Sequence, residues 1–251
     1  MQITKVDGII DTMTKDRFIR QLQIDWNVIP PESYLRNIPA LRSLEMMDFS
    51  HAVTLFAGEN GTGKSTLLEG MAQASGFNPE GGTKNFHFST YDDVSELHSA
   101  IKLIRGTRRQ RHGFFFRAES FFNVASVILN EYDDGKQPDY HSQSHGESFL
   151  NFIQEAGEDG LYLMDEPEAA LSPQRQLTLL IHIVKMAERG AQFIIATHSP
   201  ILLGIPGAEI LSFTEDGIHP TSYEETESYR ITKLFVENRQ RMLEYLLKEE
   251  E

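Results

Sequence analysis

Short runs of almost purely apolar residues alternate along the chain with segments in which apolar residues recur at helical spacing. Residues 53–57, 113–117, 161–164 and 193–196 are such runs, and their continuous apolar character is typical of strands buried on both faces of a sheet. Strands of this kind separated by helices predict an α/β fold, in which a mostly parallel sheet is covered by helices. Residues 18–24 alternate in polarity and predict an outer strand.

The helices are predicted from apolar residues three or four positions apart. One follows Gly63 and ends near Gly76. Another begins at Ser172-Pro173, where serine suits the cap and proline the first turn. The inward faces are predicted to be Leu67, Leu68, Met71 and Ala72 in the first helix, Leu177, Leu180, Ile181, Val184 and Ala187 in the second, and Val94, Leu97, Ile101 and Ile104 in a third.

Further elements are predicted in the rest of the chain. Helices are expected over residues 120–132 and from residue 148. Asp216-Gly217 predicts a hairpin after the strand at residues 209–213, which gives the sheet an antiparallel β edge. The last apolar residues predict one or two amphipathic helices: Ile231, Leu234, Phe235, Met242 and Leu246.

Polar residues follow three of the apolar runs at the point where each run ends. Gly58 follows the first, Asp165 the third and His198 the fourth. In a parallel sheet, ligands bind at the carboxyl ends of the strands. We therefore expect these three positions to meet around one ligand.

The stretch after the first run has the full pattern of a phosphate-binding loop, G-x-x-x-x-G-K-[ST]. Its glycines let main-chain N–H groups point inward, and the following helix adds the positive end of its dipole. Lys64 is expected to bind the β- and γ-phosphates of ATP, and Ser65 to bind Mg²⁺. The predicted nucleotide-binding residues are Gly58, Glu59, Asn60, Gly61, Thr62, Gly63, Lys64, Ser65 and Thr66.

Two carboxylates and one imidazole supply the remaining predicted chemistry. Asp165 ends an apolar strand and is the expected second ligand of Mg²⁺. Glu166 is placed to orient the attacking water or to accept its proton. His198 is placed to bond the γ-phosphate and to sense its loss. Glu166, Lys64 and His198 are thus the predicted catalytic residues.

Composition narrows the class of protein. The chain has 251 residues, no cysteine and a formal net charge of −14, which disfavours broad, non-specific binding to nucleic acid. Residues 102–112 form the one basic cluster, which is either a phosphate contact or a solvated turn. No apolar run approaches the roughly 20 residues of a membrane span. A cytoplasmic protein is expected.

These motifs together resemble the nucleotide-binding domains of ABC-type ATPases. The resemblance covers about residues 50 to 215 and is carried by the phosphate loop, by residues 161–173 and by Thr197-His198-Ser199-Pro200. Within these ATPases, the chain resembles the soluble branch that includes SMC-like and RecF-like proteins. It most resembles the small stand-alone predicted AAA/ABC-like ATPases of bacteria.

The resemblance also implies a domain plan. Residues 1–251 would form a single ATPase domain, in which approximately 18–115 and 161–220 build the nucleotide-binding core. Residues 116–160 would form the helical lobe, and 221–251 a C-terminal helical segment.

Further site residues follow only from the resemblance. Ser144, Gly146 and Glu147 stand where the family keeps its Ser-Gly-Gly-Gln signature, which would cap the nucleotide of a second subunit. Ser172 stands where aspartate is usual at the dimer seam. The family's glutamine before the helical lobe is absent, and Arg117 or Glu119 is the expected replacement.

The sequence therefore predicts an ATP-hydrolysing ATPase that pairs head-to-tail as an ATP-dependent homodimer. Its expected use is as a soluble switch in DNA maintenance or genome defence, with DNA or an effector protein as partner. Two alternatives stay open: the ATPase subunit of a membrane transporter, and a nucleotide-gated binding module with little turnover.

Overall fold

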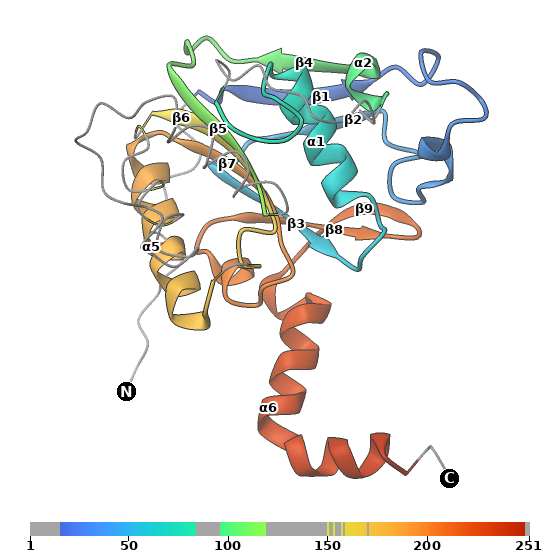
Figure 1. Cartoon of the computed structure of the whole chain (residues 1–251), viewed down its shortest axis with the longest axis vertical. Helices are drawn as coiled ribbons and strands as arrows, with labels where there is room; N and C mark the ends of the chain where they lie inside the picture. Colours follow the sequence, from blue (N-terminus) through green and yellow to red (C-terminus); the bar gives the residue numbers. More distant parts are fainter. Residues whose placement is uncertain are drawn as a thin grey trace.

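Two β-sheets with a helix between them form the body of the molecule (Figure 1). The structure is a computed structural model that describes residues 16–83, 96–118, 150, 153, 157, 159–169 and 171–248. The predicted helices at residues 120–132 and 148–154 lie largely outside these residues.

The larger sheet contains six strands in the order β5-β6-β7-β3-β8-β9. All neighbours in it are parallel except β8 and β9, which form the predicted antiparallel edge. The mostly parallel sheet and the antiparallel edge were both predicted from the sequence. The strands are β3 (Val53–Gly58), β5 (His112–Arg117), β6 (Gly160–Asp165), β7 (Gln192–Ala196), β8 (Glu209–Thr214) and β9 (Gly217–Thr221).

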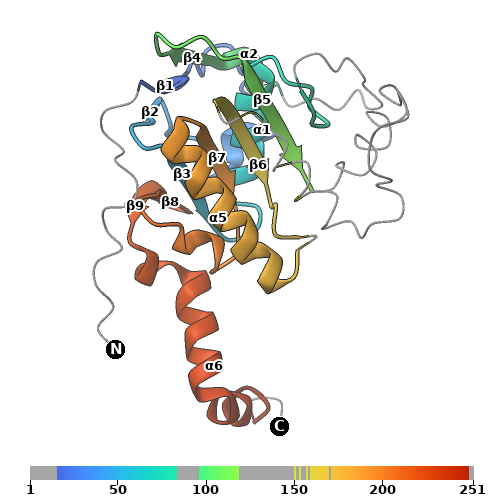
Figure 2. The same cartoon turned by 90° about the vertical axis from the view of Figure 1, so that its left-hand side faces the viewer.

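The central strands are apolar throughout because both faces of this sheet are covered. Along β3, Phe56 packs toward α1 (Lys64–Ala74), whereas Leu55 and Ala57 pack toward α5 (Pro173–Arg189). Figure 2 shows α5 lying across the sheet. Such two-sided burial removes the alternation of polar and apolar residues, as the sequence pattern predicted.

The second sheet is antiparallel and covers the outer side of α1. It has the order β2-β1-β4, with β1 (Ile19–Ile24) in the middle, β2 (Met46–Asp48) and β4 (Ile101–Arg105). Leu67, Leu68 and Met71 of α1 are fully buried in a core that includes residues of both sheets. The phosphate loop therefore leads into a helix that is held on two sides.

One buried side chain joins the two sheets directly. Gln192, at the start of β7, is only 1% exposed. Its Oε1 accepts a hydrogen bond from the backbone N–H of Ile19 at 2.9 Å, and its Nε2 donates to the carbonyl oxygen of Ile19 at 2.8 Å. The amide thus pairs with β1 as another strand would.

Two predictions about helices are wrong in part. Residues 97–104 do not form one helix: α2 (Leu97–Ala100) ends as β4 begins, and Ile101 pairs with Ile24 of β1. A short apolar run fits both periods, and pairing with β1 decides for the strand. In α5 the buried residues are Leu179, Ile183, Met186 and Ala187, while the predicted Leu177 and Ile181 are 45% and 50% exposed.

Arg108 in the basic cluster has a structural role. Its guanidinium donates to the carbonyl oxygen of Gly190 at 2.9 Å, pairs with Asp159 and lies 4.7 Å from the ring centre of Phe18. This arginine therefore links the loop between β4 and β5 to the end of α5 and to Phe18, which directly precedes β1.

The C-terminal helix α6 (Glu227–Leu246) extends away from the body (Figure 1). It contains a kink at Asn238, so the predicted one or two helices are a single element with a bend. No residue of α6 is buried, and Val236, Tyr245 and Leu246 are among its exposed apolar residues. The remaining elements are the short helices η1 (Tyr34–Asn37), η2 (Leu202–Gly204) and η3 (Tyr223–Glu225).

Replacing Gln192 by alanine is expected to lower the free energy of unfolding by about 2 to 4 kcal/mol, because two buried backbone groups of Ile19 lose their partners. Urea denaturation measures this change. Gln21→Ala is the control: its side chain donates to Asp48 in an exposed contact, and the expected loss is below about 0.5 kcal/mol. Equal effects of the two substitutions would contradict the link between the sheets.

Candidate functional site

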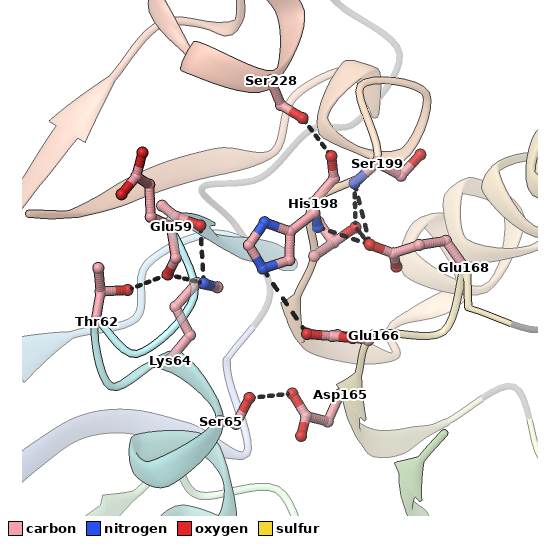
Figure 3. Close-up of polar contacts among 12 residues, drawn as sticks. Glu59, Thr62, Lys64, Ser65, Asp165, Glu166, Glu168, His198, Ser199 and Ser228 are labelled. Carbon is pink, nitrogen blue, oxygen red and sulfur yellow. Dashed lines mark hydrogen bonds and ion pairs between the residues drawn. The ribbon is translucent and has the colours of Figure 1, made fainter. Parts of the chain in front are cut away.

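The three polar positions singled out in the sequence lie at one edge of the larger sheet (Figure 3). Asp165 is opposite Ala196 across β6 and β7, and Ala196 is opposite Phe56 across β7 and β3. The strands therefore end in one row, and the residues that follow them face one another. Neighbouring strands are about 4.8 Å apart, which places all three segments within reach of one ligand.

The phosphate loop has a backbone that requires glycine at its two ends. Gly58 has φ 139°, and a Cβ there would lie 2.4 Å from the carbonyl oxygen of Phe213. Gly63 has φ 102° and caps α1 in the left-handed conformation. The loop therefore arrives at the N-terminus of α1, where unpaired N–H groups and the helix dipole favour an anion.

Lys64 is folded over its own loop. Its Nζ donates to the carbonyl oxygens of Gly58 at 2.8 Å and Glu59 at 2.7 Å, and the residue is 4% exposed. Burial lowers the pKa of Lys64, and the negative charges of Glu166 and Asp165 act in the opposite direction. The ammonium thus has little contact with water and is surrounded by oxygen atoms.

Ser65 and Asp165 form a donor set that fits Mg²⁺. The Ser65 hydroxyl donates to Oδ1 of Asp165 at 2.8 Å, so two hard oxygen atoms from different segments lie side by side. Mg²⁺ is usually bound by one or two protein carboxylates or hydroxyls together with substrate phosphates and water. The pair therefore fits the ion that the sequence predicted.

Glu166 has an unusual backbone conformation. Among the described residues it is the one non-glycine residue with positive φ, at 48°. Its N–H donates to the carbonyl oxygen of Ala196 at 2.9 Å, which ties this turn to β7. Strained backbone of this kind costs about 1–3 kcal/mol and is concentrated at functional sites. The turn directs the Glu166 carboxylate toward His198 (Figure 3).

His198 lies across from Glu166 at the mouth of the site. Nε2 of His198 is 3.8 Å from Oε1 of Glu166, and the two side chains are 36% and 44% exposed. Burial lowers the pKa of His198, the Lys64 charge lowers it further, and Glu166 and Glu168 raise it. The imidazole is therefore mainly neutral at pH 7.

A third carboxylate, which the sequence analysis did not single out, completes the cluster. Oε1 of Glu168 accepts hydrogen bonds from Oγ1 of Thr197 at 2.7 Å, from the N–H of His198 at 2.6 Å and from the N–H of Ser199 at 3.0 Å. The signal in the sequence was a carboxylate two positions after Glu166. Nothing local indicated that its partners lie in another strand.

A cavity of about 550 Å³ opens beside the phosphate loop. Its lining includes Glu59 and Thr62 of the loop, His198, and Ser228 and Ile231 of α6. The hydroxyl of Ser228 donates to the carbonyl oxygen of His198. The first turn of α6 is thus in contact with the residue that faces Glu166.

Of the site residues that were predicted only from the family resemblance, some lie in the described part of the chain and others do not. Ser144, Gly146 and Glu147 lie outside the described residues, as does Glu119. Arg117 is opposite Asp165 in the sheet, and its guanidinium is 3.2 Å from the carboxylate of Glu69 on α1. Its predicted replacement of the family glutamine stays a prediction.

Two family models match the chain. An AAA-domain family matches residues 34–155, and the family described as "AAA domain, putative AbiEii toxin, Type IV TA system" matches residues 126–204. Together the matches span residues 34–204 and include the phosphate loop, Asp165 and His198. Both models describe AAA domains, and the matches support a P-loop ATPase of the AAA type. The search of curated proteins returned no match.

Several solved structures are similar at low identity. cbiO1 from Clostridium perfringens, part of the ABC transporter complex cbiONQ, is 15% identical with a TM-score of 0.45, covering 93% of this chain and 100% of the other. An ATP-binding cassette of an ABC transporter in its ADP conformation is 16% identical with a TM-score of 0.44, covering 92% and 98%. At TM-scores below 0.5, these likenesses assign no function to this chain.

Within the described part of the chain, no helix combines the length and the apolar character needed to cross a bilayer.

Replacing Lys64 by alanine is expected to raise the pKa of His198, because a neighbouring positive charge is removed. NMR titration of the imidazole signals in nucleotide-free protein measures this shift. His182 provides a matched control, since burial and the charge of Lys185 lower its pKa. Lys185→Ala should raise the pKa of His182 and leave His198 unchanged, and Lys64→Ala should do the reverse.

An unchanged His198 titration in the Lys64 variant would contradict the proximity of the two charges.

The lowered pKa of His198 also predicts that the stability of the protein depends on pH. The unfolded chain binds a proton at this imidazole more readily than the folded chain, so its contribution to the free energy of unfolding falls as the pH drops below about 6.5.

Proposed function

We propose that the chain binds ATP with Mg²⁺ at the phosphate loop and hydrolyses it to ADP and phosphate. The observation that carries the proposal is the meeting of three distant segments at one sheet edge: Lys64 and Ser65 at the start of α1, Asp165 and Glu166 at the end of β6, and His198 after β7. The matches to two AAA-domain families support it.

ATP binding in this proposal exchanges the partners of Lys64. The ammonium leaves the carbonyl oxygens of Gly58 and Glu59 for oxygens of the β- and γ-phosphates. Because the lysine is buried and poorly hydrated, an anionic partner stabilises its charge more than a neutral carbonyl does. The N-terminus of α1 adds donors for the same phosphates.

Ser65 and Asp165 hold Mg²⁺ in the proposed complex. When bound, this ion neutralises charge on the β- and γ-phosphates. The protein's part is to fix the two oxygen atoms, which lie 2.8 Å apart. Little rearrangement of these two side chains is needed for binding.

Glu166 is the proposed proton acceptor. As water attacks the γ-phosphorus, its proton passes to the carboxylate, the new O–P bond forms, and the bond to the bridging oxygen of ADP breaks. The neutral imidazole of His198 is available to donate a hydrogen bond to a γ-phosphate oxygen, since its pKa is lowered.

We further propose that the active form is a head-to-tail pair. In one chain Glu166 and His198 are 44% and 36% exposed, so water has access to the place where the γ-phosphate would lie. Closing the site against water strengthens its electrostatic interactions. A second copy would supply this cover through Ser144, Gly146 and Glu147, as the family signature implies.

The biological role is proposed to be that of a nucleotide-driven switch acting with an effector. One of the two matched families is described with a type IV toxin–antitoxin system, and this description supports a partnered role. ATP turnover measured with and without DNA at a stated salt concentration distinguishes a DNA-dependent switch from a protein-dependent one.

Glu166→Gln is expected to lower the rate of ATP hydrolysis by about 10²- to 10⁴-fold, because the proton acceptor is lost while the phosphate loop is intact. ATP binding should be retained, and size-exclusion chromatography with ATP should reveal a trapped dimer. Hydrolysis at the wild-type rate would exclude Glu166 as the catalytic carboxylate. A monomer in ATP, with hydrolysis abolished, would exclude the paired form.

Lys64→Ala is expected to weaken ATP binding about 10- to 100-fold, the size of a lost charge-assisted hydrogen bond. Isothermal titration calorimetry with ATP and Mg²⁺ measures this loss. Lys185→Ala removes an exposed lysine from α5 and serves as the matched control, with unchanged affinity expected. If both variants bind ATP like the wild type, the phosphate loop is not the nucleotide site.

A further inference from the structure

Glu168 is the side chain that connects the turn after β6 to the segment after β7. Its Oε1 accepts three hydrogen bonds, from the hydroxyl of Thr197 and from the backbone N–H groups of His198 and Ser199. All three donors belong to consecutive residues. A single carboxylate oxygen therefore fixes the whole turn that carries His198, as Figure 3 shows.

The two oxygen atoms of the Glu168 carboxylate have different surroundings. Oε2 is buried, and no donor among the described residues reaches it. Leaving a buried oxygen without a hydrogen bond costs free energy. Such oxygens also occur at Thr54 and Ser75, outside the site. What distinguishes Glu168 is therefore the set of three hydrogen bonds that its Oε1 accepts.

The turn that Glu168 holds is fixed again by two other elements. The hydroxyl of Ser199 donates to Oε1 of Gln176 on α5 at 2.6 Å, and Ser228 of α6 donates to the carbonyl oxygen of His198. Among the described residues, Glu168 is the one that accepts a hydrogen bond from the N–H of His198. Its loss would release the backbone at the residue whose imidazole faces Glu166.

We propose that Glu168 is a positioning residue: it binds the backbone of Thr197, His198 and Ser199, and through that backbone it holds the imidazole of His198 opposite Glu166. The effect on turnover rests on the proposed ATPase function, whereas the effect on the backbone does not. Glu168 thereby links the strand that carries Asp165 and Glu166 to the strand that carries His198.

The proposal separates the binding of nucleotide from its hydrolysis. In the proposed function the phosphate loop and α1 hold the nucleotide, and the three hydrogen bonds of Glu168 go to Thr197, His198 and Ser199 instead. Replacing Glu168 should therefore leave ATP affinity within about threefold of the wild type while lowering turnover. A residue that supported the fold in general would change both quantities together with thermal stability.

Hydrogen exchange in the nucleotide-free protein tests the backbone role without any activity. In Glu168→Ala the amide of His198 should exchange about 10- to 100-fold faster, because its acceptor is gone. The amide of Ser199 should show a smaller increase, because it also donates to Oγ1 of Thr197. Glu168→Gln, which keeps one oxygen and loses the charge, should give a smaller increase. It also serves if the alanine variant fails to fold. Glu244→Gln, an exposed carboxylate on α6, is the control, with unchanged exchange expected.

A double-mutant cycle tests the consequence for turnover. ATP hydrolysis is measured for Glu168→Gln, His198→Ala and the combined variant. If Glu168 acts through His198, the combined variant is no slower than His198→Ala alone. Fully additive losses would overturn the proposal, as would wild-type exchange at His198 and Ser199 in both Glu168 variants.

The two proposals fail in different ways. A wild-type protein that binds no ATP and shows no turnover refutes the proposed function, and the exchange experiment then decides on Glu168 by itself. Turnover in the wild type with unchanged exchange in the Glu168 variants refutes the positioning role and leaves the ATPase in place.

Discussion

Three parallel strands, β6, β7 and β3, end at the same edge of the larger sheet, and the chemistry of the molecule depends on that shared edge. Their pairing places Asp165, Ala196 and Phe56 in one row, so the residues that follow each strand must face one another. The pairing is stable because both faces of these strands are buried against α1 and α5. Without this core, the phosphate loop, the turn that carries Glu166 and the segment that carries His198 would have no fixed relation.

The site contains several locally unfavourable features, and the free energy gained by packing the core offsets them. Lys64 is buried with its charge, Glu166 holds a strained positive φ, and one oxygen of Glu168 has no hydrogen-bond donor among the described residues. Each feature is unfavourable in isolation, and each faces the same small region. His198 joins them to α6 through Ser228, so the exposed C-terminal helix is in physical contact with the chemical centre.

Much of the fold could be predicted from local patterns. The apolar runs became β3, β5, β6 and β7, because continuous burial on both faces leaves a plain signal in the residues themselves. The errors came where the signal is ambiguous. Ile101 and Ile104 fit a helix or a strand, and the neighbouring strand β1 decides between them. Leu177 and Ile181 share the helical spacing, yet Leu179 and Ile183 face the sheet.

The sequence by itself determined which residue types stand at the strand ends: the glycine-rich loop with Lys64, the Asp165-Glu166 pair and His198. Only the tertiary structure decided how they are held. Glu168 and Thr197 are separated by 29 positions, and Gln192 and Ile19 by 173, yet both pairs are hydrogen-bonded. Local patterns encode the burial and conformation of each segment. A bond between distant segments depends on which strands become neighbours, and no local pattern contains that information.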